Sequence, residues 1–417
     1  MPGYSEMREV PIWVQTKKEC SIQAIYWLVG KPDSIFHTNL VNTKKEKAFT
    51  ALLMADSIEP GFEYCYDLIV NGQSISFPYP TTFTTQSIWK WRGDPPKFSF
   101  LFGSGAYIVE PEYDRPGIPY GAAYEIYDAM ADMNVDFMIW MGDNVYLREV
   151  DWNSHTGVIQ RYTHDRSLPE LQRFLASTHH YAIWDDHDFG PNDSDRAYWM
   201  KDKTLEAFKL FWANPSYGTD DLKGAISFFN YADADFFLLD NRTYRAPNQL
   251  KADHKSQLGE KQLQWLLDNL VSSVAKFKFV VLGGQFLSTS EEYESYSNYG
   301  FKEERQKIID FIYENDLTNV IFLTGDVHFS EISVLRDKGK PTIWDLTSSP
   351  LNSGVNKYAL EKQNTLRIPE SVIMDRNFTK INVTGTANDR MLQISFYNSK
   401  GQELFSYKIK SEEKMLK

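Results

Sequence analysis

The stretch Val135–Tyr146 (VDFMIWMGDNVY) joins an apolar segment directly to a glycine and a carboxylate. Its first seven residues are almost all apolar, which is typical of a strand buried on both faces. Gly142 permits a sharp turn, so that Asp143 emerges at the end of the strand. The same arrangement, an apolar strand followed at once by polar groups, recurs elsewhere in the chain and predicts both the fold class and the position of a site.

Apolar segments and amphipathic segments alternate on both sides of this stretch. We predict strands at Phe98–Phe102, Val135–Met141, Tyr181–Trp184, Asp235–Leu239, Phe277–Leu282 and Val320–Leu323. Helices are predicted between them, for example at Tyr120–Met133, Lys203–Trp212, Ser256–Ser272 and Lys302–Asn315. Alternation of this kind gives a layered α/β core. The last stretch, Thr379–Ile409, returns to strands, with a hairpin turn at Gly401.

The first 92 residues have a different pattern, that of short strands without a helical period. Cys20–Trp27 and Phe62–Val70 alternate between apolar and other residues, and Asn71-Gly72 is typical of a type I′ hairpin turn. We therefore predict a small β-sandwich of fibronectin or immunoglobulin type over residues 1–92, without chemistry of its own. Trp91–Pro96 (WRGDPP) marks the boundary to a second domain over residues 97–417.

The composition narrows the possible partners. The chain has 417 residues, 24% of them charged, and a net charge of −12. Such an acidic balance argues against long nucleic acids and anionic lipid surfaces. We expect no membrane span, because no apolar run reaches the ~18 residues that one needs. The chain has two cysteines, Cys20 and Cys65, which we interpret as small buried residues, with a single disulfide as the alternative.

Three further polar clusters follow predicted strands. Trp184–Asp188 (WDDHD) crowds three carboxylates around one histidine, which is costly unless cations or hydrogen bonds hold them. Thr324–His328 (TGDVH) places Asp and His two residues apart, on one side of an extended chain. Leu282–Gln285 (LGGQ) offers an amide oxygen. Taken singly, each of these could be a turn, a solvated acidic loop or a hydrogen-bonded pair.

Together the four clusters favour a metal site. Ligands of open α/β sheets bind at the carboxyl ends of the strands, so these loops are expected to converge. They supply oxygen and nitrogen donors for two ions, and they contain no candidate nucleophile better than water. This combination indicates metal-assisted hydrolysis.

The motifs GDNVY, WDDHD and GDVH, with LLDNRTYR at Leu238–Arg245, occur in an order that resembles the PhoD-type alkaline phosphatases and phosphodiesterases. That family is a branch of the calcineurin-like metallophosphoesterases, and the resemblance runs from about Phe98 to His328. It implies a four-layer αββα domain preceded by a small β-sandwich. It also implies hydrolysis of small phosphate mono- or diesters, and a periplasmic or secreted location. Met1–Val10 contains no basic-then-apolar leader, so we expect the natural N-terminus to have been trimmed.

Carried over by position, the resemblance implies two metal sites. The ligand set it implies is Asp143, Tyr146, Asp186, Gln285, Asp326 and His328. Asp143 would bridge the two ions, with Tyr146 and His328 on the first. The family has a cysteine ligand where this chain has Gly105, so a soft thiolate ligand is missing. Asp114 or a water molecule could take its place as a metal ligand. The metals are accordingly left open among Fe, Ca, Zn and Mn.

The same resemblance assigns the catalytic groups. His187 would contact the phosphate and protonate the leaving oxygen, oriented by Asp188, while water activated by the metals attacks phosphorus. Asp240 and Arg242 would lie behind the ligands or face the phosphate. Candidate phosphate-binding arginines are Arg115, Arg148, Arg161, Arg166 and Arg196, with 161–166 as a loop over the site.

Three other functions fit parts of the pattern. A nuclease would share the metal chemistry, although the acidic balance disfavours it. A two-carboxylate glycosidase would use Asp185–Asp188 but would leave GDNVY and GDVH without a role. A binding protein without catalysis would act through the first domain.

Overall fold

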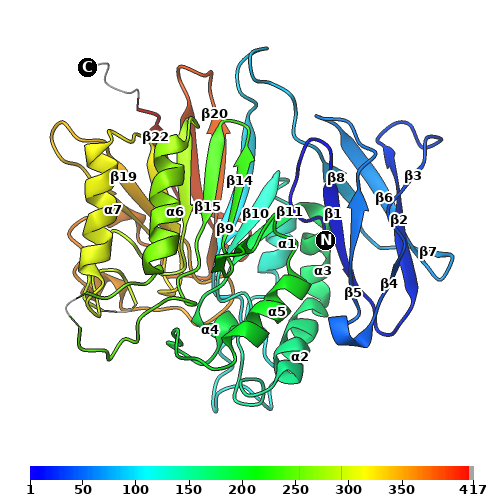
Figure 1. The fold of residues 1–417 in the computed structure, drawn as a ribbon, viewed down its shortest axis with the longest axis horizontal. Helices are drawn as coiled ribbons and strands as arrows, with labels where there is room; N and C mark the ends of the chain where they lie inside the picture. Colours follow the sequence, from blue (N-terminus) through cyan, green and yellow to red (C-terminus); the bar gives the residue numbers. More distant parts are fainter. Residues whose placement is uncertain (253, 293, 413–417) are drawn as a thin grey trace.

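Two six-stranded sheets lie face to face in the larger part of the computed structural model, which describes residues 1–252, 254–292 and 294–412 (Figure 1). The first sheet has, in spatial order, β11 (His179–Ile183), β10 (Phe137–Met141), β9 (Phe98–Gly103), β20 (Asn377–Thr384), β21 (Met391–Asn398) and β22 (Glu403–Lys410). The second has β14 (Ser227–Tyr231), β15 (Ala234–Leu238), β16 (Phe277–Val281), β17 (Val320–Thr324), β19 (Ile343–Thr347) and β18 (Glu331–Leu335).

Aromatic side chains fill the space between the two sheets. Phe100 of β9 stacks on Phe137 with ring centroids 5.0 Å apart. The same ring meets Phe236 and Phe279 of the second sheet edge-on at 5.4 Å. All four are fully buried, so that this aromatic layer holds the sheets together.

Helices cover both outer faces. On the first sheet lie α1 (Ile126–Ala131), α2 (His155–Arg166), α3 (Pro169–Ser177), α4 (Asp186–Phe189) and α5 (Lys201–Phe211). On the second lie α6 (Gly259–Ser272) and α7 (Lys302–Glu314), whose apolar sides pack on Phe237, Val280 and Phe322. The predicted four-layer αββα arrangement is confirmed.

The N-terminal part is a small sandwich, with β1 (Val10–Gln15) and β5 (Thr50–Ala55) on one side. The other sheet has β2 (Ser21–Leu28), β3 (Phe36–His37), β4 (Val41–Asn42), β6 (Glu63–Val70), β7 (Gln73–Ile75) and β8 (Thr82–Thr84). Asn71 and Gly72 join β6 to β7 with φ of 49° and 80°, as a type I′ turn requires. Cys20 and Cys65 are half-buried free thiols, so the disulfide alternative is wrong. The domain limits at 92 and 97 stay a prediction.

Several predicted boundaries were wrong for local reasons. The helix expected from Tyr120 begins only at Ile126, because Ala123 takes a left-handed φ of 58° and Ala122 is tied to the Asn352 carbonyl. The segment 161–166, expected as a loop, is the second half of α2. A short ribbon, β12 (Gly218–Thr219) with β13 (Leu222–Lys223), was not predicted. No helix among the described residues is long and apolar enough to cross a membrane.

The sandwich packs tightly against the first sheet. The Trp13 indole N–H donates to the Leu210 carbonyl at 2.7 Å. His179, at the start of β11, lies with Nδ1 2.8 Å from the Gly3 carbonyl, and its Nε2 accepts the Thr84 amide at 3.1 Å. Both ring nitrogens are thereby used by a neutral imidazole, and burial lowers the pKa of His179 to about 4.

We expect this histidine to make the fold sensitive to acid. Its pKa is near 6.5 when unfolded and about 4 when folded, so its contribution is full above pH 6.5 and is lost as the pH falls towards 4. The loss should reach about 3 kcal/mol, at 1.36 kcal/mol per pKa unit. Urea unfolding of His179→Gln between pH 7 and 4 should show a smaller pH dependence than the wild type. His37→Gln, at an exposed position, should match the wild type; equal slopes for all three proteins would contradict the prediction.

Candidate metal centre

The four polar loops meet at the carboxyl ends of strands from both sheets. Asp143 follows β10, Asp186 and His187 open α4 after β11, and Asp326 and His328 follow β17. Glycines let the loops approach: a Cβ at Gly142 would lie 2.6 Å from the Asp185 Cβ, and one at Gly283 would lie 2.7 Å from the Asp185 Oδ2. The convergence expected from the sequence is therefore present in the structure.

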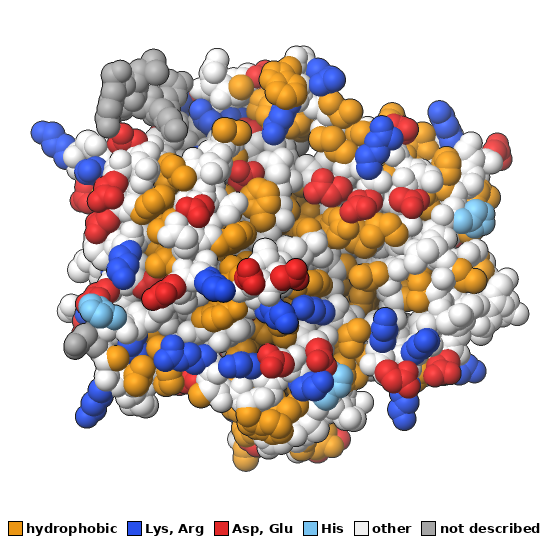
Figure 2. Space-filling model, viewed as in Figure 1, with side chains coloured by type: hydrophobic (Ala, Val, Ile, Leu, Met, Phe, Trp, Pro, Cys, Tyr) orange, Lys and Arg blue, Asp and Glu red, His pale blue; other side chains and the backbone are white. Residues whose placement is uncertain are grey.

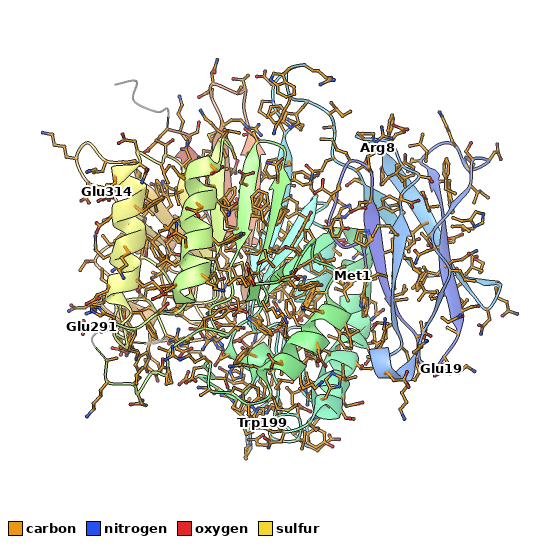
Figure 3. All side chains as sticks on the ribbon, viewed as in Figure 1. Met1, Arg8, Glu19, Trp199, Glu291 and Glu314 are labelled. Carbon is orange, nitrogen blue, oxygen red and sulfur yellow. The ribbon has the colours of Figure 1, made fainter. Side chains whose placement is uncertain are left out.

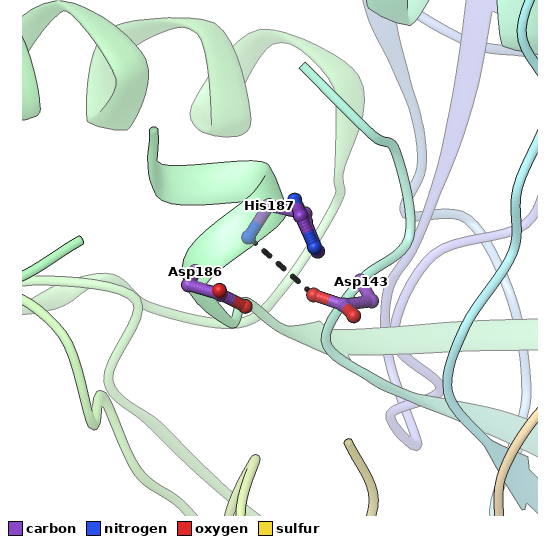
Figure 4. Close-up of side chains that lie close together, drawn as sticks. All are labelled: Asp143, Asp186 and His187. Carbon is purple, nitrogen blue, oxygen red and sulfur yellow. Dashed lines mark hydrogen bonds between the residues drawn. The ribbon is translucent and has the colours of Figure 1, made fainter. Parts of the chain in front are cut away.

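Asp143, Asp186 and His187 form the centre of the cluster (Figure 4). One donor atom from each lies within 4.8 Å of the others, and all three side chains are buried. The His187 backbone N–H donates to the Asp143 Oδ1 at 3.4 Å, which ties the first turn of α4 to the loop after β10 (Figure 4). This spacing is short enough for the three donors to share one cation.

Tyr146 and His328 extend the cluster on the other side of Asp143. The Tyr146 hydroxyl donates to the Asp143 Oδ2 at 2.9 Å and lies 3.3 Å from the His328 Nε2. The His328 Nδ1 lies 2.6 Å from the Gly354 carbonyl oxygen, which can only accept. A proton on Nδ1 leaves the Nε2 lone pair directed at Tyr146, the tautomer that a metal-binding histidine needs.

Three of these residues have strained backbone conformations. Asp143, Asp326 and His328 have φ of 50°, 69° and 60°, in the left-handed region. Such conformations cost free energy at residues other than glycine and persist where the surrounding structure enforces them. The loops are thus held in a geometry that brings the side chains together.

The carboxylates strongly influence one another's protonation. Burial raises the pKa of Asp143 and of Asp326 well above the usual range, and neighbouring carboxylates, Asp185 and Asp186 among them, raise both further. Burial would also raise the pKa of Asp186, but His187 and Arg242 bring it down to about 2. Cations bound among these groups would relieve the repulsion.

The Gln285 side chain is buried, and its amide nitrogen is bound by residues outside the cluster. Its side-chain amide donates to Glu331 Oε1 at 2.9 Å and to Thr347 Oγ1 at 3.1 Å. No hydrogen bond among the described residues joins it to Asp143, Asp186 or Asp326. Its assignment as a ligand accordingly stays a prediction.

Asp188, expected to orient His187, contacts the backbone around it and makes no hydrogen bond to the His187 ring among the described residues. Its carboxylate accepts the backbone N–H groups of Asp185 and Asn144, at 3.0 and 3.1 Å, and so closes the N-terminus of α4. Successive side chains of a helical turn point in different directions, which separates Asp188 from the His187 ring. The buried His187 Nδ1 has no hydrogen-bond partner.

Arg242 lies behind the cluster. It is fully buried, and its guanidinium pairs with Asp185, with Glu294 at 2.5 Å and with Asp186 at 3.8 Å. Asp240 holds the turn that carries it by accepting the backbone N–H groups of Arg242 and Thr243. These contacts favour the first of the two predicted positions, behind the ligands. Glu294 was missed by the sequence analysis, because no motif surrounds it.

The remaining five arginine candidates differ in where they lie. Arg161 and Arg166 are buried away from the cluster, Arg161 in ion pairs with Glu110 and Asp151. Arg115 and Arg148 lie close enough to act on His187: burial lowers the pKa of that imidazole and both arginines lower it further, whereas Asp186 opposes them. Arg196 makes a backbone contact with Arg245.

The structure explains why Gly105 is accommodated at the position of the family cysteine. Its φ is 79°, and a Cβ there would lie 2.9 Å from the Ser353 Oγ and 3.2 Å from the Pro350 Cβ. The proposed substitute Asp114 is engaged otherwise, since it accepts the Tyr107 hydroxyl at 2.5 Å and the Tyr120 amide at 3.2 Å. A thiolate would therefore need the surrounding loop to shift.

Buried acceptor atoms without partners fit a metal centre. Asp185 Oδ2, Asn241 Oδ1 and Asn144 Oδ1 are buried and have no hydrogen-bond partner. Such atoms are rare unless water or an ion satisfies them. With the crowded carboxylates and the His328 lone pair, they form a donor set of hard oxygens and imidazole that suits divalent or trivalent cations.

Two facing sheets with this carboxylate–histidine cluster define a protein of the metallophosphoesterase class. A model of the PhoD-like phosphatase family matches residues 113–390, more than half of the chain. The chain therefore belongs to the PhoD-like phosphatase family, and the resemblance predicted from its motifs is confirmed.

Individual relatives agree with this assignment. Alkaline phosphatase D of Bacillus subtilis (strain 168) is 25% identical over 370 residues, covering 75% of this chain and 59% of that protein. A solved structure of PhoD superposes with a TM-score of 0.80 at 19% identity, covering 99% of this chain and 89% of that one. The purple acid phosphatase PPD1 of yellow lupin (Lupinus luteus) has a TM-score of 0.70 at 11% identity, covering 98% and 74%. These two likenesses show the fold.

We predict that Asp143→Asn stabilises the metal-free protein. Removing one of the crowded carboxylates relieves repulsion, which should raise the free energy of unfolding by ~1–2 kcal/mol in EDTA. The same variant should lose the stabilisation that added Mn²⁺ or Zn²⁺ gives the wild type. Thermal unfolding with and without metal measures both effects. Asp310→Asn, on the exposed face of α7, should behave as the wild type; a destabilised Asp143→Asn protein in EDTA would contradict the prediction.

Proposed function

We propose that this protein is a metal-dependent phosphoesterase that hydrolyses small phosphate mono- or diesters. The observation that carries the proposal is the position of Asp143, within reach of both the Asp186–His187 pair and the Tyr146–His328 pair. Membership of the PhoD-like phosphatase family supports the reaction class. The aligned region spans about three fifths of the curated relative's length.

The residues would share the work as follows. Asp143, Tyr146 and His328 would hold one cation, and Asp143, Asp186 and Asp326 a second, with Gln285 as a further candidate. When bound, these ions supply Lewis-acid activation of water and neutralise the phosphoryl charge. Arg242 holds Asp185 and Asp186 in place through its ion pairs.

His187 would handle the proton of the leaving group. Burial lowers the pKa of its imidazole, so the ring is neutral in the free protein at neutral pH. A bound phosphate beside it would favour its protonation, and the ring could then donate to the departing oxygen. Asp188 would contribute by fixing the first turn of α4, which carries His187.

Arg115 and Arg148 would bind the non-bridging phosphate oxygens. The Arg115 guanidinium stacks on the Tyr120 ring at 3.9 Å, and Tyr120 in turn contacts His328 Nδ1 at 2.9 Å. The Arg148 Nε donates to the Tyr113 carbonyl at 3.2 Å. Both arginines are thereby held close enough to act on His187, and their positive charge favours an anionic group beside it.

Small esters fit this surface better than long polyanions. Figure 2 shows Lys and Arg side chains together with Asp and Glu over one face of the molecule. The net charge of −12 acts in the same direction. Metal identity stays among Fe, Ca, Zn and Mn, and export to the periplasm or outside the cell is likewise our proposal.

Chelation should abolish turnover reversibly. After dialysis against EDTA, hydrolysis of p-nitrophenyl phosphate and bis-p-nitrophenyl phosphate should stop, and one of the candidate metals should restore it. Elemental analysis of the active sample identifies the ion, and a visible phenolate band would mark iron on Tyr146. Asp143→Asn should stay inactive with every metal. Full activity of a metal-free sample would refute the mechanism, and comparing the two substrates determines the ester preference.

Replacing His187 should affect esters with poor leaving groups most. His187→Asn should lower kcat for an alkyl phosphate by ~10²–10⁴-fold, the usual contribution of general acid catalysis. For p-nitrophenyl phosphate, whose leaving group needs no proton, the loss should be tenfold or less. His254→Asn, at an exposed position, serves as the control. Equal losses on both substrates would show that His187 does not donate this proton.

A further inference from the structure

A large cavity lies between the N-terminal sandwich and the helices of the first sheet, away from the metal centre. Its volume is about 1020 Å³, at the upper end of the range of ~300–1,000 Å³ usual for ligand pockets. Figure 3 places Met1, which lines it, at the junction of the sandwich and the helices. No residue that we place in the metal centre lines the cavity.

Apolar and aromatic side chains form most of the wall. Tyr66, Phe77 and Tyr79 come from the sandwich, whereas Ile159 of α2 and Leu175 of α3 face them from the helices. Phe77 and Tyr79 stack on each other with centroids 5.6 Å apart. Such a wall suits a hydrocarbon chain or ring.

The charges along the wall have the opposite sign to that of the whole protein. Three permanently cationic side chains, Lys17, Lys45 and Arg166, line the cavity, against a single carboxylate, Glu46. The chain as a whole carries a net charge of −12, so the excess of positive charge at this cavity differs from the charge of the protein as a whole. An anionic group is therefore favoured here.

Arg166 is the buried member of this set. Its side chain is 8% exposed and stacks over Trp212 at 4.0 Å, with one guanidinium nitrogen donating to the Phe211 carbonyl at 3.2 Å. Its Nε is buried without a hydrogen-bond partner, and no ion pair to it occurs among the described residues. Burial lowers its pKa to about 10, so it stays cationic at neutral pH. The buried carboxylates Asp165 and Asp188 raise its pKa but form no ion pair with it, so its charge can still favour an anionic ligand.

We propose that this cavity binds a small amphiphile with an anionic head group, of the class of a medium-chain carboxylate. The hydrocarbon part lies between the aromatic side chains of the sandwich and Ile159, and the head group lies near Arg166 and Lys45. The Gln15 side chain spans the two halves by donating to Thr163 of α2 at 2.9 Å, so the wall is already assembled in the free protein. This site is independent of the proposed phosphoesterase activity.

Calorimetric titration of the full chain with sodium octanoate, below its micelle concentration, tests the proposal. We expect saturable binding of one octanoate per chain. Uncharged 1-octanol should bind at least tenfold more weakly, because it lacks the anionic head group. Absence of saturable binding would overturn the proposal, and equal affinity for octanol would show a neutral apolar site instead.

Two variants test whether octanoate binds in this cavity. Ile159→Trp fills part of the volume and should weaken octanoate binding at least tenfold, whereas Val274→Trp, on an exposed turn, should not. Lys45→Glu changes an exposed residue, so folding is not at risk, and it should weaken binding at least fivefold; Lys338→Glu is its control. Unchanged affinity in both Ile159→Trp and Lys45→Glu would mean that octanoate binds elsewhere.

Discussion

Repulsion among buried carboxylates is the constraint on which the rest of this structure depends. Asp143, Asp185, Asp186 and Asp326 come from loops on both sheets and are forced together at the strand ends. Charges of one sign do not gather in a protein interior unless the fold and bound counter-ions hold them there. The aromatic layer around Phe100 supplies that rigidity, because it fixes the two sheets at one separation.

Part of the negative charge of these carboxylates is compensated by a side chain of the protein itself. Arg242 neutralises the side of the cluster that faces the protein interior, where it pairs with Asp185 and Glu294. No ion pair joins Asp143 to a lysine or arginine among the described residues. Asp185 Oδ2 and Asn241 Oδ1 are buried acceptors without hydrogen-bond partners. The arginine therefore compensates only part of the negative charge, and bound metal ions would compensate more of it.

The N-terminal sandwich makes specific contacts with the larger domain. Its contacts with β11 use a neutral histidine, and a cavity lined by apolar and cationic side chains lies between it and α2. The helix α2 follows the loop that carries Tyr146 and Arg148, so the sandwich and the metal centre are supported by neighbouring segments of one stretch of chain.

How much the sequence could predict depended on the range of the interactions. The apolar strands, the Asn71-Gly72 turn and the loops carrying Asp143, Asp186 and Asp326 could be predicted, because hydrophobic period and turn chemistry act between residues that are close in the chain. The polar helix α2 was missed, since its sequence has no clear apolar stripe.

By itself, then, the sequence determined the layered fold, the family and the set of candidate ligands. Only the tertiary structure decided that Arg242 pairs with Glu294, that Asp188 caps α4, and that the Gln285 amide donates to Glu331. The reason is physical: side-chain direction and ion pairing are set by packing between segments distant in the chain, and no local pattern records that packing.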